Sequence, residues 1–228
     1  MPTFVLVHGG WGGAWNWRDL VAEFEHRGAS WRALDLPSSH DPAGVADLQA
    51  DAAIVCEVAT MSEPVVLVGH SYGGCVVTEA ASRVVNLVGV VYVAALVPAV
   101  GESALNAVRR TKVRTELDDA IITDEPFLNL DPGRAGSALY GECTLANQAW
   151  AVDQLGSQTI ASFRSPRQSP DASAARRYVR CAHDRAIDPS LQALMGAACD
   201  DVIELSSDHS PFLSHPIELA DLILDWPN

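Results

Sequence analysis

The chain has 228 residues, of which 48% are hydrophobic and 19% charged, with a formal net charge of −14. This composition supports a sizeable core and excludes a disordered chain. The negative charge argues against nucleic acid as a partner, because binding phosphates needs a basic face.

Short β-branched runs alternate with longer helical patterns through the first 98 residues. Strands are predicted at 3–8, 30–35, 64–69 and 87–94, and helices at about 14–26, 44–60 and from the third strand to about 85. Continuous apolar strands that are each followed by a helix predict a parallel sheet covered on both faces. Right-handed crossovers then favour a doubly wound, mostly parallel α/β sheet.

The alternation stops after Pro98. Residues 99–174 contain no strong strand pattern and several helical stretches, and we interpret them as a helical cap inserted into a single domain. The alternation resumes with strands at 177–182 and 201–205 and helices at 189–198 and 216–225. The core of the domain is therefore predicted to comprise 1–98 and 175–228.

One basic cluster interrupts this acidic chain within the predicted cap. It contains Arg109, Arg110, Lys112 and Arg114, followed at once by Glu116, Asp118 and Asp119. A mixed run of this kind is usually a solvated helix face, and we interpret it so rather than as an anion site.

The segment Gly69-His70-Ser71-Tyr72-Gly73 is the most informative in the chain. Acyl transfer needs an exposed hydroxyl that lies close to a base and beside backbone N–H donors. A sharp turn between a strand and a helix presents such a hydroxyl, and it requires glycine two residues before and two after the nucleophile. The segment therefore predicts Ser71 as a nucleophile.

A glycine-rich loop, His8-Gly9-Gly10-Trp11-Gly12-Gly13, follows the first predicted strand. An oxyanion hole needs two convergent N–H donors, which we assign to Gly10 and Tyr72. The alternative is a dinucleotide-binding turn, but the glycines are not spaced as GxGxxG and only Asp35 fits that pattern. We therefore expect no cofactor, and we interpret His8 as a structural residue that shapes the loop.

His209 lies in the loop after the last predicted strand. Functional groups of an open α/β sheet gather at the carboxyl ends of its strands, so His209 is the expected general base. His215 is the alternative, although its place before the closing helix suits a residue at a helix entry.

Asp184 follows the strand predicted at 177–182. A carboxylate there can accept the second imidazole N–H of the base, which sets its tautomer and stabilises the imidazolium. Asp188 is the runner-up, and Asp208 directly precedes the histidine, so that it cannot readily fold back onto its ring. The chain order Ser, Asp, His is the one expected of this fold.

These motifs resemble the α/β-hydrolase superfamily over nearly the whole chain. Within it, VHGGWGGAWNW, GHSYGG and SSDHSPFLSHP resemble the branch of plant methylesterases and hydroxynitrile lyases with their small bacterial relatives. The resemblance implies cofactor-free catalysis by Ser71, His209 and Asp184, with an oxyanion hole formed by Gly10 and Tyr72.

The same resemblance allows an esterase to be compared with a hydroxynitrile lyase. The lyases carry a threonine after the histidine of the first loop and a lysine after the catalytic histidine. Here these positions hold Gly9 and Ser210, so the resemblance favours an esterase.

We therefore expect a hydrolase that cleaves a small carboxylic ester through an acyl-enzyme. Apolar pocket surface is expected from Trp11, Tyr72, Trp150, Phe163 and Phe212, for each of which ordinary core packing is the open alternative. A ligand-binding protein with little turnover, or a lyase, cyclase or cofactor-free oxygenase on the same scaffold, also stays open because fold alone does not determine the reaction.

The cysteines and the hydropathy of the chain indicate a cellular compartment. Five cysteines occur without a CxxC pair, which gives no support for a structural zinc site and predicts free thiols in a reducing compartment. The N-terminal apolar run is too short for a signal sequence, and no apolar run reaches the length of about 18 residues needed for a membrane span. We expect a cytoplasmic protein without a metal ion; a homodimer stays open.

Overall fold

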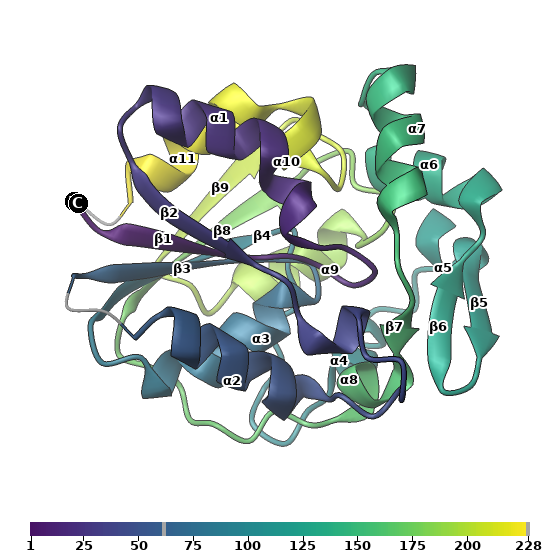
Figure 1. Cartoon of the computed structure of the whole chain (residues 1–228), viewed down its shortest axis with the longest axis horizontal. Helices are drawn as coiled ribbons and strands as arrows, with labels where there is room; N and C mark the ends of the chain where they lie inside the picture. The colour runs from purple at the N-terminus through teal and green to yellow at the C-terminus, as the bar shows by residue number, and fades with distance from the viewer. Residues whose placement is uncertain (61–62, 227–228) are drawn as a thin grey trace.

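The structure, a computed structural model, describes residues 1–60 and 63–226. Its centre is a six-stranded sheet with the order β2-β1-β3-β4-β8-β9, in which each neighbouring pair is parallel. The strands are β1 (Thr3–Val7), β2 (Ser30–Leu34), β3 (Val65–His70), β4 (Leu87–Val93), β8 (Ala175–Cys181) and β9 (Asp201–Leu205). The predicted doubly wound parallel sheet is confirmed (Figure 1).

Helices cover both faces of this sheet (Figure 1). One face carries α1 (Arg18–His26), α10 (Pro211–Ser214) and α11 (Pro216–Leu224), and the other carries α2 (Leu48–Val58), α3 (Gly73–Ala80) and α9 (Pro189–Gly196). Short 3-10 turns lie at η1 (Ala14–Trp17), η2 (Pro37–Ser39) and η3 (Ala81–Arg83). Successive strand residues point to opposite faces, so Phe4 and Leu6 pack on the first side while Val5 and Val7 pack on the second.

The predicted helix at 44–60 begins later, because Asp47 caps it. The side chain of Asp47 accepts a hydrogen bond from the Ala50 N–H at 3.0 Å. A carboxylate at this position satisfies an N–H that has no partner within the helix. The helix therefore starts at Leu48, and the residues before it form a loop.

The inserted segment contains strands as well as helices, which corrects the purely helical prediction. Its helices are α4 (Ala104–Val108), α5 (Glu116–Ala120), α6 (Pro132–Tyr140), α7 (Leu145–Gln154) and α8 (Ile160–Arg164), and an antiparallel sheet joins β5 (Ile121–Asp124), β6 (Phe127–Leu130) and β7 (Gln158–Thr159). The first two strands have four residues each and are at most half-buried. They therefore lack the buried apolar run that marks a core strand.

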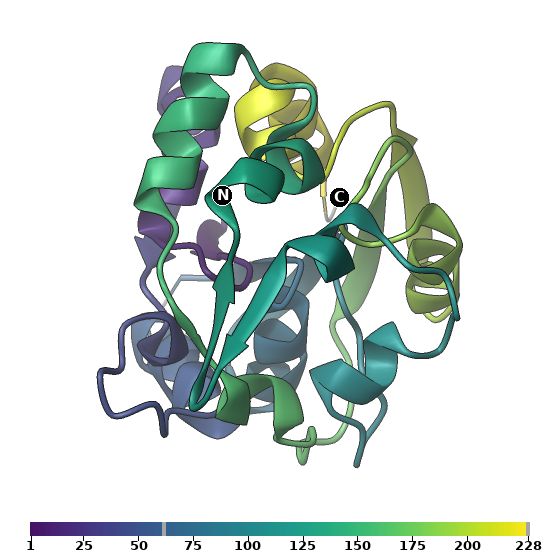
Figure 2. The ribbon, with the colours of Figure 1, turned by 90° about the vertical axis from the view of Figure 1, so that its right-hand side faces the viewer.

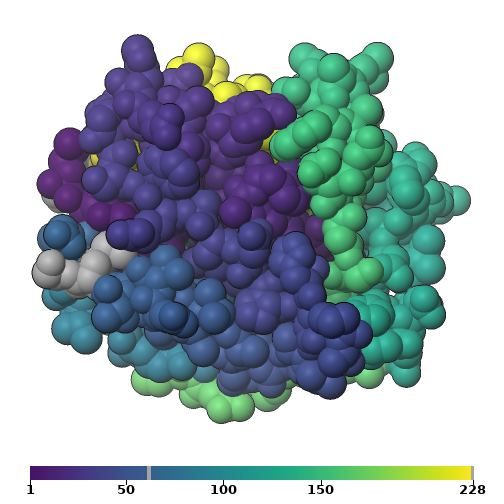
Figure 3. Space-filling model, viewed as in Figure 1, coloured from purple at the N-terminus to yellow at the C-terminus, as the bar shows by residue number. Residues whose placement is uncertain are grey.

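This segment lies across the end of the sheet toward which its strands run (Figure 1). Figure 2 looks onto it, and the space-filling view shows it forming one side of the molecule (Figure 3). The loops after β1, β3, β4 and β8 therefore meet the inserted segment. Within residues 1–60 and 63–226, no helix combines the length and the apolar character needed to cross a bilayer.

Candidate active site

Ser71 occupies the sharp turn between β3 and α3. Its φ of 53° lies in the left-handed region, which costs a non-glycine residue roughly 1–3 kcal/mol and persists only where the surroundings enforce it. A Cβ on Gly69 would lie 2.6 Å from Val77 Cγ2, and one on Gly73 would overlap the backbone of β1. Both glycines are therefore required for the turn that presents the Ser71 hydroxyl.

The loop after β1 lies directly against this serine. A Cβ on Gly9 would be 2.8 Å from Ser71 Cβ. The Trp11 N–H donates to Gln158 Oε1 at 3.1 Å. By contrast, the N–H groups of Gly10 and Tyr72 have no protein acceptor in the part of the chain that the structure describes. Both N–H groups are therefore available to a ligand at this turn.

The His8 side chain holds this loop through two hydrogen bonds. Its Nδ1–H donates to the Gly9 carbonyl at 2.7 Å, and its Nε2 accepts the Leu36 N–H at 3.0 Å. Burial lowers the pKa of His8 to about 4. A neutral imidazole with both nitrogens occupied is a structural group, in agreement with the interpretation from the sequence.

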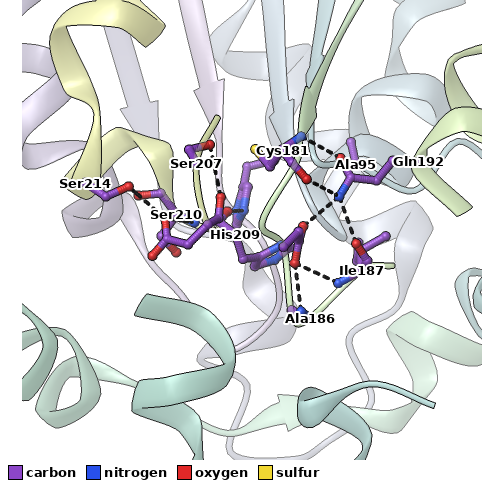
Figure 4. Close-up of polar contacts among 12 residues, drawn as sticks. Ala95, Cys181, Ala186, Ile187, Gln192, Ser207, His209, Ser210 and Ser214 are labelled. Carbon is purple, nitrogen blue, oxygen red and sulfur yellow. Dashed lines mark hydrogen bonds and ion pairs between the residues drawn. The ribbon is translucent and has the colours of Figure 1, made fainter. Parts of the chain in front are cut away.

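The structure brings His209 and Asp184 into direct contact. His209 Nδ1 donates to Asp184 Oδ2 at 2.7 Å, and both side chains are buried. Asp184 Oδ1 accepts the N–H groups of Ala186 at 2.7 Å and Ile187 at 2.9 Å, while Gln192 Nε2 donates to Oδ2 at 2.8 Å. These donors gather on one side of His209 (Figure 4) and hold the carboxylate in a single orientation.

The rival acids and the rival base have other roles. Asp188 accepts the Ser190 N–H at 2.9 Å and caps α9. Asp208 accepts a hydrogen bond from Ser214 Oγ at 2.7 Å. His215 contacts the same Ser214 hydroxyl at 3.0 Å and precedes α11. These contacts direct all three side chains toward helix ends.

His70, which was not among the predicted site residues, connects the Ser71 turn to the loop that carries His209. Its Nε2–H donates to the His209 carbonyl at 2.9 Å, and the two rings lie 4.5 Å apart. Burial holds the pKa of His70 well below its usual value, so the ring stays neutral. Among the described residues no hydrogen bond joins Ser71 to His209. Such bonds are often long in unliganded enzymes and tighten when substrate binds.

A cavity of about 480 Å³ opens above Ser71, between the sheet and the inserted segment. Trp11, Tyr72 and Phe163, three of the five aromatic residues named from the sequence for the pocket, line it. The Tyr72 and Phe163 rings stack with centroids 5.0 Å apart. This size suits a small organic ligand.

Two of the predicted pocket residues do not line this cavity. Trp150 packs edge-on against Trp15, with centroids 5.4 Å apart, and lies beneath the Arg18 guanidinium. Phe212 is fully buried against Trp17. Both rings are held by other aromatic side chains, so their surface serves packing.

A buried polar network connects the core, the glycine-rich loop after β1 and the inserted segment. Asp51 on α2 accepts hydrogen bonds from Ser38 Oγ at 2.6 Å and from the Tyr72 hydroxyl at 2.7 Å. Gln158 Nε2 donates to the same Ser38 hydroxyl at 2.8 Å, while its Oε1 binds the Trp11 N–H. Gln158 is fully buried. It thereby fixes the loop that carries the free Gly10 N–H.

This network predicts a pH-dependent stability. Burial raises the pKa of the Asp51 carboxyl to about 6, against about 3.9 in an unfolded chain. The folded protein therefore holds this proton more tightly, and the stabilising contribution is lost as pH rises from about 4 to about 6. We expect the free energy of unfolding of the parent protein to fall by about 3 kcal/mol relative to Asp51→Asn over that interval.

Urea unfolding at the two ends of this interval, followed by tryptophan fluorescence, measures the difference. Asp153→Asn, which removes an exposed acidic group from α7, is the matched control. A difference between the parent protein and Asp51→Asn that does not change with pH would contradict the assignment.

The described residues hold no group of three or more His, Cys, Asp or Glu side chains arranged to bind a metal ion. A serine on a strand–helix turn, next to a His–Asp pair at neighbouring strand ends of a parallel sheet, defines a hydrolase of the α/β type. Comparison with protein families agrees, because the alpha/beta hydrolase family matches residues 4–222. The chain belongs to this family.

Individual relatives differ in their reactions. The chain is 26% identical to norfluorocurarine synthase 2 from Strychnos sp, over 97% of this chain and 94% of the relative. It is 27% identical to methylesterase 3 from Arabidopsis thaliana, over 98% and 95%. The crystal structure of a pyrethroid hydrolase from Sphingobium faniae JZ-2 matches with a TM-score of 0.87 at 22% identity, over 99% and 96%. The last comparison supports the fold.

Proposed function

We propose that this protein is a carboxylic-ester hydrolase that works through an acyl-enzyme on Ser71. The observation that carries the proposal is the buried hydrogen bond between His209 and Asp184, at the strand ends beside a serine held in a strained turn. Nucleophile, base and orienting acid in this relation are the requirements of acyl transfer.

In the proposed reaction, Ser71 Oγ attacks the ester carbonyl carbon while His209 Nε2 takes the hydroxyl proton. The oxyanion of the tetrahedral intermediate accepts hydrogen bonds from the N–H groups of Gly10 and Tyr72. His209 then gives its proton to the leaving alkoxide. Water then attacks the acyl-enzyme carbonyl while His209 takes a proton from it. When this second tetrahedral intermediate breaks down, His209 returns the proton to Ser71 Oγ and the acid is released.

Ester hydrolysis is favoured over a lyase reaction by two positions. Ser210 follows the proposed base, where the lyases that the chain resembles carry a lysine. A side chain at Gly9 would collide with Ser71, because even a Cβ there would lie 2.8 Å from Ser71 Cβ. The threonine of the lyases therefore has no room here.

Incubation with p-nitrophenyl acetate and p-nitrophenyl butyrate tests the proposal. We expect release of p-nitrophenolate with an initial burst whose amplitude matches the enzyme concentration, since attack on Ser71 precedes hydrolysis of the acyl-enzyme. Mass spectrometry of the quenched protein should find the acyl group on the peptide that contains Ser71. Absence of both turnover and acylation would contradict an esterase.

A further inference from the structure

Three of the four residues of the basic cluster in the inserted segment line the cavity above Ser71. Residues 109–115 form the connection between α4 and α5, not the helix face predicted from the sequence. Arg109, Lys112 and Arg114 all contribute to the cavity wall. Each of them is exposed, whereas Ser71 is only 9% exposed. The cations therefore lie on the solvent side of the cavity and the serine on its buried side.

Two of these cations have no acidic partner. Arg114 is paired with Asp119. Among the described residues, Arg109 and Lys112 make neither an ion pair nor a side-chain hydrogen bond. Lys112 is also the single lysine of the sequence. In a chain with 29 acidic and 15 basic residues, two unpaired cations at one opening are a local reversal of charge.

The acidic residues of the same wall are engaged elsewhere. Asp118 accepts the Thr115 N–H at 2.8 Å in the capping box of α5. Asp188 accepts the Ser190 N–H at 2.9 Å at the start of α9. Both carboxylates are held by helix N-termini, where negative charge is stabilised. Their hydrogen bonds leave the two free cations to bind a ligand.

Apolar side chains form a further part of the cavity wall. Leu105, Val108, Leu117 and Leu128 contribute to it. A ligand that fills the cavity therefore meets the buried Ser71, apolar side chains and exposed cations. Long-range repulsion by the acidic chain would disfavour an anionic ligand, so a built-in positive rim has a use only if the ligand is anionic.

We infer that the substrate is an ester that carries a carboxylate, which Arg109 and Lys112 bind while the ester group lies at Ser71. This inference rests on the proposed esterase function and adds the class of substrate. Arg109 supplies a planar guanidinium that pairs with two carboxylate oxygens, and Lys112 supplies a mobile point charge. Both act on binding, so their effect is expected in KM.

Pairs of esters that differ in one charge test the inference. Monomethyl adipate and methyl hexanoate place a carboxylate or a methyl group on the acyl side, and 4-carboxyphenyl acetate and p-tolyl acetate do the same on the alcohol side. We expect a lower KM for the charged member of at least one pair. The double variant Arg109→Gln/Lys112→Gln should lower kcat/KM for that charged ester about fivefold and change its neutral partner less than about twofold, the scale expected for two exposed ion pairs.

The double variant Arg32→Gln/Arg83→Gln is the matched control, because it removes two exposed cations that do not line the cavity. Raising the ionic strength from about 0.01 M to about 1 M shortens the screening length from about 30 Å to about 3 Å. It should therefore raise KM for the charged ester of the parent protein and leave the neutral ester unchanged.

The outcomes separate the two proposals. Turnover of charged and neutral esters with equal kcat/KM, unaffected by Arg109→Gln/Lys112→Gln, overturns the carboxylate site and leaves the esterase in place. An equal loss for both members of each pair also overturns it. Failure of the parent protein to cleave any of the four esters would instead count against the esterase itself.

Discussion

Ser71→Ala is expected to lower kcat for p-nitrophenyl butyrate by about 10⁴-fold to 10⁶-fold, the loss found when the nucleophile of a Ser-His-Asp enzyme is removed. The substitution deletes the oxygen that forms the acyl-enzyme, so the burst should disappear as well. Folding should survive, although alanine also meets the positive φ of 53° at this position. Steady-state and stopped-flow absorbance measure both effects.

Ser210→Ala is the matched control for this variant. Ser210 directly follows the proposed base and is buried, so the control removes a nearby hydroxyl while leaving the turn after β3 intact. We expect it to retain the burst. Turnover that persists in Ser71→Ala and vanishes in Ser210→Ala would contradict the assignment of the nucleophile to Ser71 and would place it in the loop after β9.

Asp184→Asn is expected to lower kcat by about 10⁴-fold with little change in structure, because an amide at this position favours the wrong tautomer of the base. Asp184 accepts four hydrogen bonds, from two backbone N–H groups, Gln192 and His209. An asparagine oxygen can still accept the two backbone bonds. Its NH₂ would then face His209 Nδ1, leaving the proton on the nitrogen that must accept one from Ser71.

Asp188→Asn separates this role from that of a neighbouring carboxylate. Asparagine caps a helix about as well as aspartate, so the variant should keep α9 intact and retain activity within about threefold. A pH profile of kcat/KM for both variants completes the comparison. If Asp188→Asn proved the more damaging of the two, the orienting acid would be Asp188.

Arg109 and Gln158 illustrate why the inserted segment was harder to interpret from the sequence than the core. Arg109 stands in a mixed-charge run whose usual place is a helix surface, yet the chain turns there and the residue lines a cavity. No motif in the sequence sets Gln158 apart from other polar residues. Its contact with Trp11 joins positions 147 residues apart, a separation that no local pattern encodes.

The sequence likewise does not show whether an aromatic residue lines the cavity or packs in the core. Phe163 lines the cavity and Phe212 packs in the core, although both lie in the first turn of a short helix. Burial of an aromatic ring is equally favourable in either place. Which of the two it serves depends on the neighbouring helices, and these are assembled only in the folded chain.

The sequence by itself determined the parallel sheet and the serine turn, because each depends on local rules. Continuous apolar strands followed by helices have few possible arrangements, and a crowded turn admits only glycine at Gly69 and Gly73. Three features appear only in the folded chain: the anchoring of Asp184 by Gln192, the support of the glycine-rich loop after β1 by Gln158, and the charge at the cavity rim. These depend on distances between side chains that are remote along the chain, which residue order and composition do not specify.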